Sequence, residues 1–214
     1  MTTAEGWTAA VRDRLAPGRL LPLGAEAEDA WIAERAVRGV LEAAAGAVVG
    51  AVPGELRVGV EYADGAAPGA VRISGGFAAV AGSRPLPELA AELRAALLRA
   101  AEDGLGLVVG SVDLRVTELL DAAPENAGAP AAPSGRPSPA TDDPAALAAL
   151  RVEGVAGVTD TLGPPVRRTP GHVRVEVAVT AGRRPLEVAR AVRTAVTAAT
   201  QGATAVTVLV SELR

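Results

Sequence analysis

The sequence predicts an α+β fold of two tandem small modules. Each module is expected to have the order helix-strand-strand-helix-strand, with its helices on one face of a three-stranded sheet. The first observation is an internal repeat, because RPLPELA at 84–90 returns as RPLEVA at 184–189. With one inserted residue the two copies align glutamate on glutamate, at an offset of 187 − 88 = 99. Both continue in a helical pattern and end in a Val-rich strand, at 112–119 and 206–213. Self-similarity over such a unit indicates a duplicated module.

The second observation is the composition. Hydrophobic residues make up 49% of the chain and charged residues 21%, which is typical of a chain that buries a core. Aromatic residues reach only 2%, so the core is expected to consist of Val, Leu, Ile and Ala. The net charge of −4 argues against general binding to nucleic acid or to anionic lipid.

Residues 1–25 are predicted to form an N-terminal segment with a short helix at 8–15, followed by a loop whose leucines pack onto module 1. Module 1 is expected at 26–121. Its first helix is predicted over about 27–45, where apolar residues recur at helical spacing. The acidic residues Glu26, Glu28 and Asp29 would lie in the first turn, where they suit the helix dipole.

The rest of module 1 follows from alternation and turn residues. A half-buried strand is predicted at 56–62 and a return strand at 71–79, joined by a hairpin loop at 63–69. Gly75-Gly76 in the return strand suggests a bulge. A helix beginning near Pro87 and the strand 112–119 complete the module.

The segment 122–143 is rich in Pro and Ala and has no large apolar residue between 124 and 139. It cannot bury enough surface to offset its ordering entropy, so it is predicted to be a semi-extended linker. Module 2 is expected at 144–214, opened by Asp143 as N-cap and Pro144 as first helical residue. Its clearest strand is 173–179; its second helix has a buried stripe of Val188, Val192, Val196 and Ala199.

This pattern resembles the alkaline shock protein family of bacterial envelope stress response proteins. Module 2 carries the likeness in VEGVAGV at 152–158, VRVEVAV at 173–179 and PLEVARAVR at 185–193. The whole layout, with GWTAAVR at 6–12 and WIAE at 31–34, is also similar to proteins from GC-rich bacteria labelled nucleopolyhedrovirus p-ten-like. The resemblance implies a non-enzymatic cytoplasmic protein, often gathered at the membrane by a separate anchor protein and linked to cell-envelope stress.

The residue inventory excludes much site chemistry. Cys and Lys are absent, which excludes thiol nucleophiles and Schiff-base lysines. Because His172 is the only histidine, we also exclude His-based metal clusters and catalytic triads. We therefore expect no metal, no cofactor and no catalysis. The glycines at 104, 106 and 110 are interpreted as a helix end rather than a dinucleotide loop, because they follow a helix. With no signal peptide and no apolar stretch of about 18 residues, we expect a cytoplasmic protein without a membrane span.

Four arginines are the candidate ligand site. Arg167, Arg168, Arg183 and Arg184 flank a strand and a helix start of module 2, where guanidinium groups can bind phosphate or carboxylate. The alternative interpretation is loop charge that keeps a Val-rich surface soluble.

A candidate interface also lies in module 2. The stretch 164–170, which would pair with the strand 173–179, is bracketed by prolines, so the edge carrying Val173 and Val175 is predicted to be under-paired. On the closing strand, Asp113 and Arg115 correspond at an offset of 207 − 113 = 94 to uncharged residues, Thr207 and Leu209. We expect this surface to contact module 1 or a second chain.

Together these observations favour a non-catalytic assembly or scaffold protein that associates with itself and with protein partners, including a membrane-anchor protein. The alternative is a module that binds a small anion through the four arginines.

Overall fold

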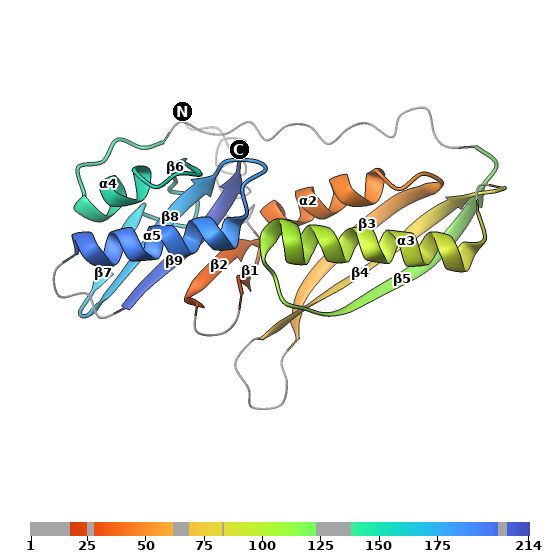
Figure 1. Ribbon diagram of the computed structural model, residues 1–214, viewed down its shortest axis with the longest axis horizontal. Helices are drawn as coiled ribbons and strands as arrows, with labels where there is room; N and C mark the ends of the chain where they lie inside the picture. The colour runs from red at the N-terminus through yellow and green to blue at the C-terminus, as the bar shows by residue number, and fades with distance from the viewer. Residues whose placement is uncertain (1–17, 25–27, 62–68, 83, 123–137, 201–204) are drawn as a thin grey trace, which may run out of the picture.

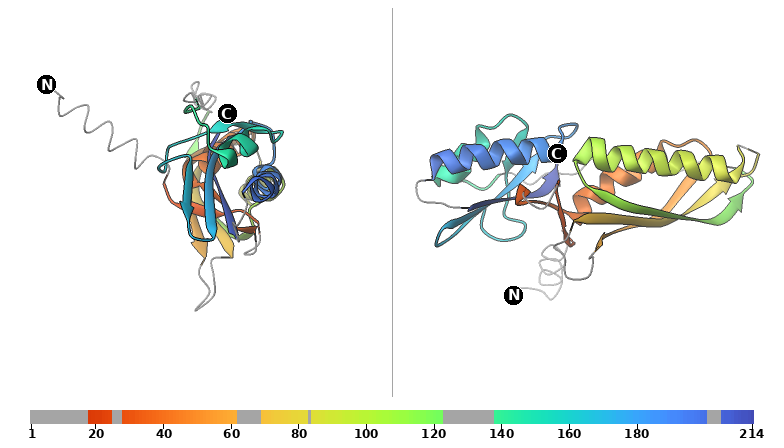
Figure 2. Two further views of the ribbon diagram at one scale, coloured as in Figure 1. Left: turned by 90° about the vertical axis from the view of Figure 1, so that its left-hand side faces the viewer. Right: turned by 60° about the horizontal axis from the view of Figure 1, so that its bottom comes forward.

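A computed structural model of the chain describes residues 18–24, 28–61, 69–82, 84–122, 138–200 and 205–214. Two β-sheets lie side by side, and pairs of helices cover the same face of both (Figure 1). Helices α3 and α5 follow one another along this face, as the right panel of Figure 2 shows. The predicted α+β class is confirmed.

The first half follows the predicted element order. It consists of α2 (Glu34–Gly46), β3 (Ala51–Glu61), β4 (Ala70–Val80), α3 (Leu86–Arg99), a π-helical turn η2 (Ala100–Leu105) and β5 (Val109–Leu120). The strands form a sheet in the order β3-β4-β5, antiparallel and then parallel. Val37, Leu41, Leu89, Leu93 and Leu97 bury the helix faces against Ile73 and Phe77.

The second half departs from the predicted three-stranded sheet. It contains α4 (Pro144–Leu150), β6 (Val155–Val158), β7 (Val166–Thr169), β8 (His172–Val179), α5 (Pro185–Ala199) and β9 (Ala205–Leu213). Two strands from the start of the chain, β1 (Leu20–Pro22) and β2 (Ala30–Ala33), join the same sheet. The order is β1-β2-β9-β8-β6, with β7 also paired to β8. Strand β1, from the predicted N-terminal segment, and β2, from the start of the predicted module 1, thus complete the sheet of module 2.

The predicted helix over 27–45 is wrong at its start, and the leucines at 20 and 21 are strand rather than loop. Asp29 adopts a left-handed conformation (φ +46°), which no helix continues through. The strand AWIA then pairs with β9 through its first three residues, and the helix begins only at Glu34. A four-residue apolar run fits both the helical and the strand period, so its partner decides its structure.

The predicted under-pairing of the strand 173–179 is also wrong. The prolines at 165 and 170 flank β7 without interrupting it, since all four ladder residues between them, Val166–Thr169, are not proline. Even the carbonyl of Pro165 accepts the N–H of Glu176, at 2.8 Å. Because β6 covers the other half of this edge and β9 the opposite edge, β8 is a central strand.

Three local features differ in detail or are refined. The bulge expected at Gly75-Gly76 lies in the facing strand β3, between Pro53 and Leu56. Ala199 is exposed, and Thr200 is buried in its place, its hydroxyl donating to the Val196 carbonyl. Gly106, in the left-handed region at φ +88°, ends η2 as the interpretation of the glycine triplet predicted.

Asp143 caps α4, accepting the Ala145 N–H at 2.8 Å, with Pro144 as first helical residue. The predicted short helix at 8–15, most of the hairpin loop 63–69 and most of the linker 122–143 lie outside the described residues.

Candidate protein-interaction edge

The two closing strands, β5 and β9, occupy equivalent places in the two sheets. Each runs parallel to the long strand before it, β4 or β8. On the outer edge of β9 lies β2, in parallel register with Trp31 opposite Leu209. The N–H of Val208 donates to the Asp29 carbonyl at 3.0 Å. Among the described residues no strand pairs with the corresponding outer edge of β5.

The hydrogen bonds of β4 show which backbone groups of β5 are left on that edge. The Val80 N–H donates toward β3, to Gly50, whereas the Val71 N–H donates toward β5, to Val108 at 2.8 Å. The backbone groups of odd-numbered β4 residues therefore point toward β5. In a parallel ladder each of them bonds to the two residues on either side of its register partner, so Ile73, opposite Val112, bonds to 111 and 113. As a result, the backbone groups of Val112, Leu114 and Val116 point away from the sheet.

One side chain occupies part of this edge. Arg94 of α3 donates from Nε to the Val112 carbonyl at 3.3 Å, which agrees with that carbonyl lying outside the ladder. The bond is long and exposed, so it is a weak cover for one acceptor. An open row of backbone donors and acceptors is a template for another strand.

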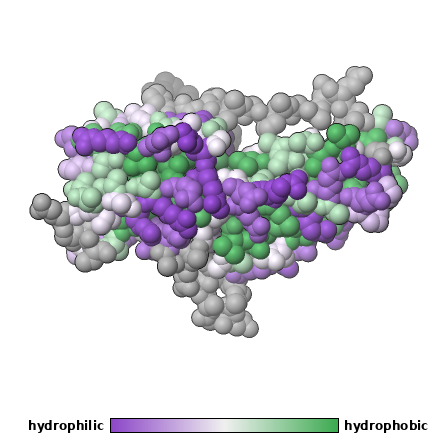
Figure 3. All heavy atoms as spheres, viewed as in Figure 1, coloured by the Kyte–Doolittle hydropathy of each residue, from purple (hydrophilic) through white to green (hydrophobic). Residues whose placement is uncertain are grey.

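The side chains of β5 add apolar surface to the open edge. Val116 and Leu119, on the side that carries the helices, are 37% and 63% exposed. At the offset of 94, Leu114 and Val116 correspond in β9 to Val208 and Val210, which are fully buried. On the opposite face Asp113 and Arg115 are exposed, and Asp113 pairs with Arg72 at 3.1 Å. Figure 3 shows apolar and polar patches alternating below α3, over this part of the sheet.

The other edge of the same sheet is built differently. Strand β3 carries Pro53, a bulge, and the exposed pair Glu55 and Arg57, whose charged groups lie 3.3 Å apart. Proline, a bulge and charges are the features that discourage edge-to-edge pairing. β5 also carries charges and two register irregularities, but no proline interrupts its 12 residues and the stretch from 111 to 116 between the irregularities is regular. The open edge of β5 is thus the better template of the two.

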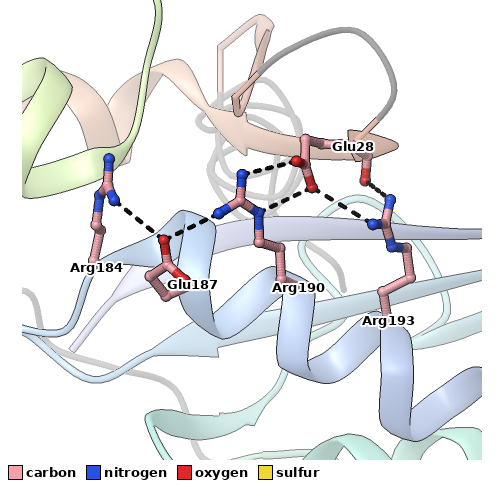
Figure 4. A network of polar contacts seen from close by, with 5 residues as sticks. All are labelled: Glu28, Arg184, Glu187, Arg190 and Arg193. Atoms are coloured by element: carbon pink, nitrogen blue, oxygen red, sulfur yellow. Dashed lines mark hydrogen bonds and ion pairs between the residues drawn. The ribbon is translucent and has the colours of Figure 1, made fainter.

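An ion-pair network fastens the N-terminal segment to module 2 (Figure 4). The carboxylate of Glu28 accepts from Arg190 at 2.8 and 3.1 Å, and Arg193 donates to the Glu28 carbonyl at 2.6 Å. The hydrogen bond from Arg190 lowers the pKa of Glu28 below its ordinary value. Glu187, in the first turn of α5 as expected, links Arg190 to Arg184. This network holds the segment that leads into β2, the strand that covers the β9 edge.

The four candidate arginines do not form one site. Arg167 and Arg168 lie on β7 at the start of β8, and Arg183 and Arg184 follow its far end. Three of them already have acidic partners: Arg168 pairs with Asp143 at 2.8 Å, Arg183 with Glu153, and Arg184 with Glu187 at 3.1 Å. Arg184 also donates to the Glu102 carbonyl at 3.0 Å, which joins the two halves of the molecule.

The three candidate interface residues lie in different places. Val173 and Val175 are buried inside the sheet of module 2, on its central strand. Leu209 is buried opposite Trp31, under the strand that the N-terminal segment supplies. The surface with lost charges therefore contacts β2, at the start of the predicted module 1, which is one of the two outcomes expected.

A buried carboxylate escaped sequence reasoning. Glu176 is fully buried, accepting the Thr159 hydroxyl at 2.8 Å and the N–H groups of Thr161 and Leu162 at 2.9 and 3.0 Å. Burial raises its pKa above the ordinary value. Alternation along the strand places Glu176 on the polar face, and no signal in the sequence shows that the loop after β6 covers it. The group organises this loop and faces no open site.

The remaining chemistry is sparse. His172 contacts the Thr207 hydroxyl at 2.8 Å. In the described parts of the chain, no three His, Cys, Asp or Glu side chains come together as a metal ion would need. None of the helices that the structure describes is long and apolar enough to cross a membrane.

Comparison of the chain with protein-family models, curated proteins and solved structures finds no match.

Proposed function

We propose that this protein is a non-catalytic assembly protein that binds other protein chains by strand addition to the outer edge of β5. The observation that carries the proposal is the asymmetry of the two closing strands. The edge of β9 is covered by β2, while the edge of β5 presents the outward backbone groups of Val112, Leu114 and Val116. Main-chain hydrogen bonds at such an edge supply affinity, and the side chains on either face supply specificity.

The cellular setting of the proposal comes from the resemblance of module 2 to alkaline shock proteins. It suggests a cytoplasmic protein that takes part in the cell-envelope stress response, associates with itself and reaches the membrane through an anchor protein. An anion-binding module is less well supported, because three of the four arginines are paired with carboxylates and the four are split between two ends of β8.

The experiment is site-specific photo-crosslinking in the native cell. A photoreactive residue replaces Thr117, exposed on β5, or Val49, exposed in the turn after α2. We expect the probe at position 117 to form discrete crosslinked species with protein, either this chain or another. The probe at position 49 should form few. Equal and diffuse labelling from both positions would contradict the proposal, because the β5 edge would then be ordinary surface.

A further inference from the structure

We propose that the occupant of the β5 edge is β5 of a second copy, antiparallel and in the register that places Leu114 opposite its own counterpart. The inference rests on the proposed function and names its partner. Two three-stranded sheets would become one six-stranded sheet across a two-fold axis. Such an interface is isologous, since the same strand serves both partners.

The backbone geometry selects where the axis can lie. In this register residue i faces residue 228 − i, from 2 × 114, so Leu114 meets Leu114 and Val112 meets Val116 of the second copy. These are the residues whose N–H and C=O groups point away from β4. In an antiparallel ladder such outward residues form the hydrogen-bonded pairs. The register thus uses all the free groups from 112 to 116.

The charges choose the same register. Asp113 then faces Arg115 of the second copy in a pair without backbone hydrogen bonds, where side chains come closest. The two-fold axis makes this happen twice. Moving the axis to residue 113 or 115 would set aspartate against aspartate or arginine against arginine, which destabilises a ladder. Arg115 has no ion-pair partner within the described residues, so its charge is available for this contact.

The strand's regular stretch has the matching extent. The β4–β5 register shifts between Val71 and Arg72, and again between Phe77 and Ala78. Between these irregularities β5 runs regularly from 111 to 116, and this stretch contains residues 112–116, which the proposed ladder pairs with themselves. On the helix side, Val116 and the half-buried Val112 and Leu114 would extend the apolar core across the axis. Arg94 would exchange its long bond to the Val112 carbonyl for solvent.

The molecule already contains a strand added to the equivalent edge of module 2, although β2 runs parallel to β9 there. At the offset of 207 − 113 = 94, Leu114 corresponds to Val208. The N–H of Val208 donates to the carbonyl of Asp29, the residue directly before β2. The edge that accepts β2 in module 2 is therefore the edge left open in module 1. Where the partner strand belongs to the same chain, the positions of Asp113 and Arg115 are uncharged; where it would come from a second copy, they carry complementary charges.

The first test uses the absence of cysteine from the chain, so that one introduced cysteine is the only thiol. Under mild oxidation, chains with Asp113→Cys mixed with chains with Arg115→Cys should form a disulfide-linked dimer, since cross-strand neighbours satisfy disulfide geometry. Each chain alone should form much less, because like positions lie diagonally apart. Val49→Cys, on an exposed turn, is the control. If Asp113→Cys alone were linked as fast as the mixture, the register would be wrong.

The second test is a charge exchange measured by sedimentation equilibrium of the full chain. Arg115→Asp would place aspartates opposite each other twice, and should raise the dimer dissociation constant about tenfold or more. Adding Asp113→Arg to the same chain should restore it, an outcome that a general loss of folding cannot produce. Wild-type chain that stays monomeric at every concentration would overturn this inference. If crosslinks from Thr117 to another protein persisted, the proposed function would still stand.

Discussion

Truncation of Ile32 to alanine tests whether β2 is part of the module 2 sheet. Ile32 is fully buried, opposite Val210 of β9 and Leu21 of β1, which are themselves fully buried. The change removes three carbons, worth about 2.4 kcal/mol at ~0.8 kcal/mol for each. The cavity left behind adds to this, and such truncations cost about 2–5 kcal/mol in total.

That loss is large beside the roughly 5–15 kcal/mol by which folded domains are stable. At about 2–4 °C for each kcal/mol, the melting temperature should fall by between about 4 and 20 °C. Amide hydrogen exchange locates the effect. Protection of the Val208 N–H, which donates to Asp29 on the β2 side, should fall before that of amides in the central strand β8.

Val49→Ala is the matched control, because Val49 is 75% exposed in the turn after α2. A substitution at such a position should change stability by less than about 0.5 kcal/mol. The reasoning is refuted if Ile32→Ala costs under about 1 kcal/mol and leaves Val208 as protected as before. Such a result would mean that β2 does not dock on β9.

Two further predictions concern pH and the junction of the two halves. Because burial raises the folded-state pKa of Glu176, its stabilising contribution is complete below the ordinary value of 4.5 and is lost as pH rises through the raised pKa. Glu176→Gln should therefore gain stability relative to the wild type as pH increases, measured as the difference in melting temperature between acidic and neutral buffer; a pH-independent difference would contradict it. Gly106→Ala should destabilise more than Gly82→Ala, measured by denaturant unfolding. Both glycines have positive φ, but only at Gly106 would the new Cβ meet Leu186, 2.4 Å away; equal losses would show that this contact yields freely.

Much of the fold follows from local patterns that are strong in this chain. Alternation over eight residues predicts β8, and α3 and α5 begin at the prolines within the two copies of the repeat. The N-cap at Asp143 was likewise readable, because side-chain capping depends on residues adjacent in sequence.

The main failures concern which strands meet. AWIA at 30–33 is too short for its period to separate helix from strand, and its partner lies about 180 residues away in the sequence. The stretch 164–170 was discounted because of its prolines, although four residues between two prolines suffice for a ladder. Pairing across such distances depends on tertiary packing, which no local pattern encodes.

The sequence predicts which strand of each module carries the candidate site, but not which of the two strands has an open edge. Comparing Asp113 and Arg115 with Thr207 and Leu209 singled out the closing strand as the surface where the modules differ. The sequence could not show which of the two edges is filled from within the chain, since that depends on where β2 docks.

The charge difference between the closing strands has a physical logic once both edges are known. An edge covered by a strand of the same chain, as β9 is by β2, needs no charges, and Leu209 is buried there. An edge that is open in the free chain needs charge to discourage indiscriminate pairing. Two charges of a single sign at 113 and 115 would repel in the registers centred on 113, 114 and 115. Asp113 and Arg115 repel their own counterparts in the registers centred on 113 and 115, and attract each other in the register centred on Leu114. The same two side chains would thus both protect the edge and select its partner.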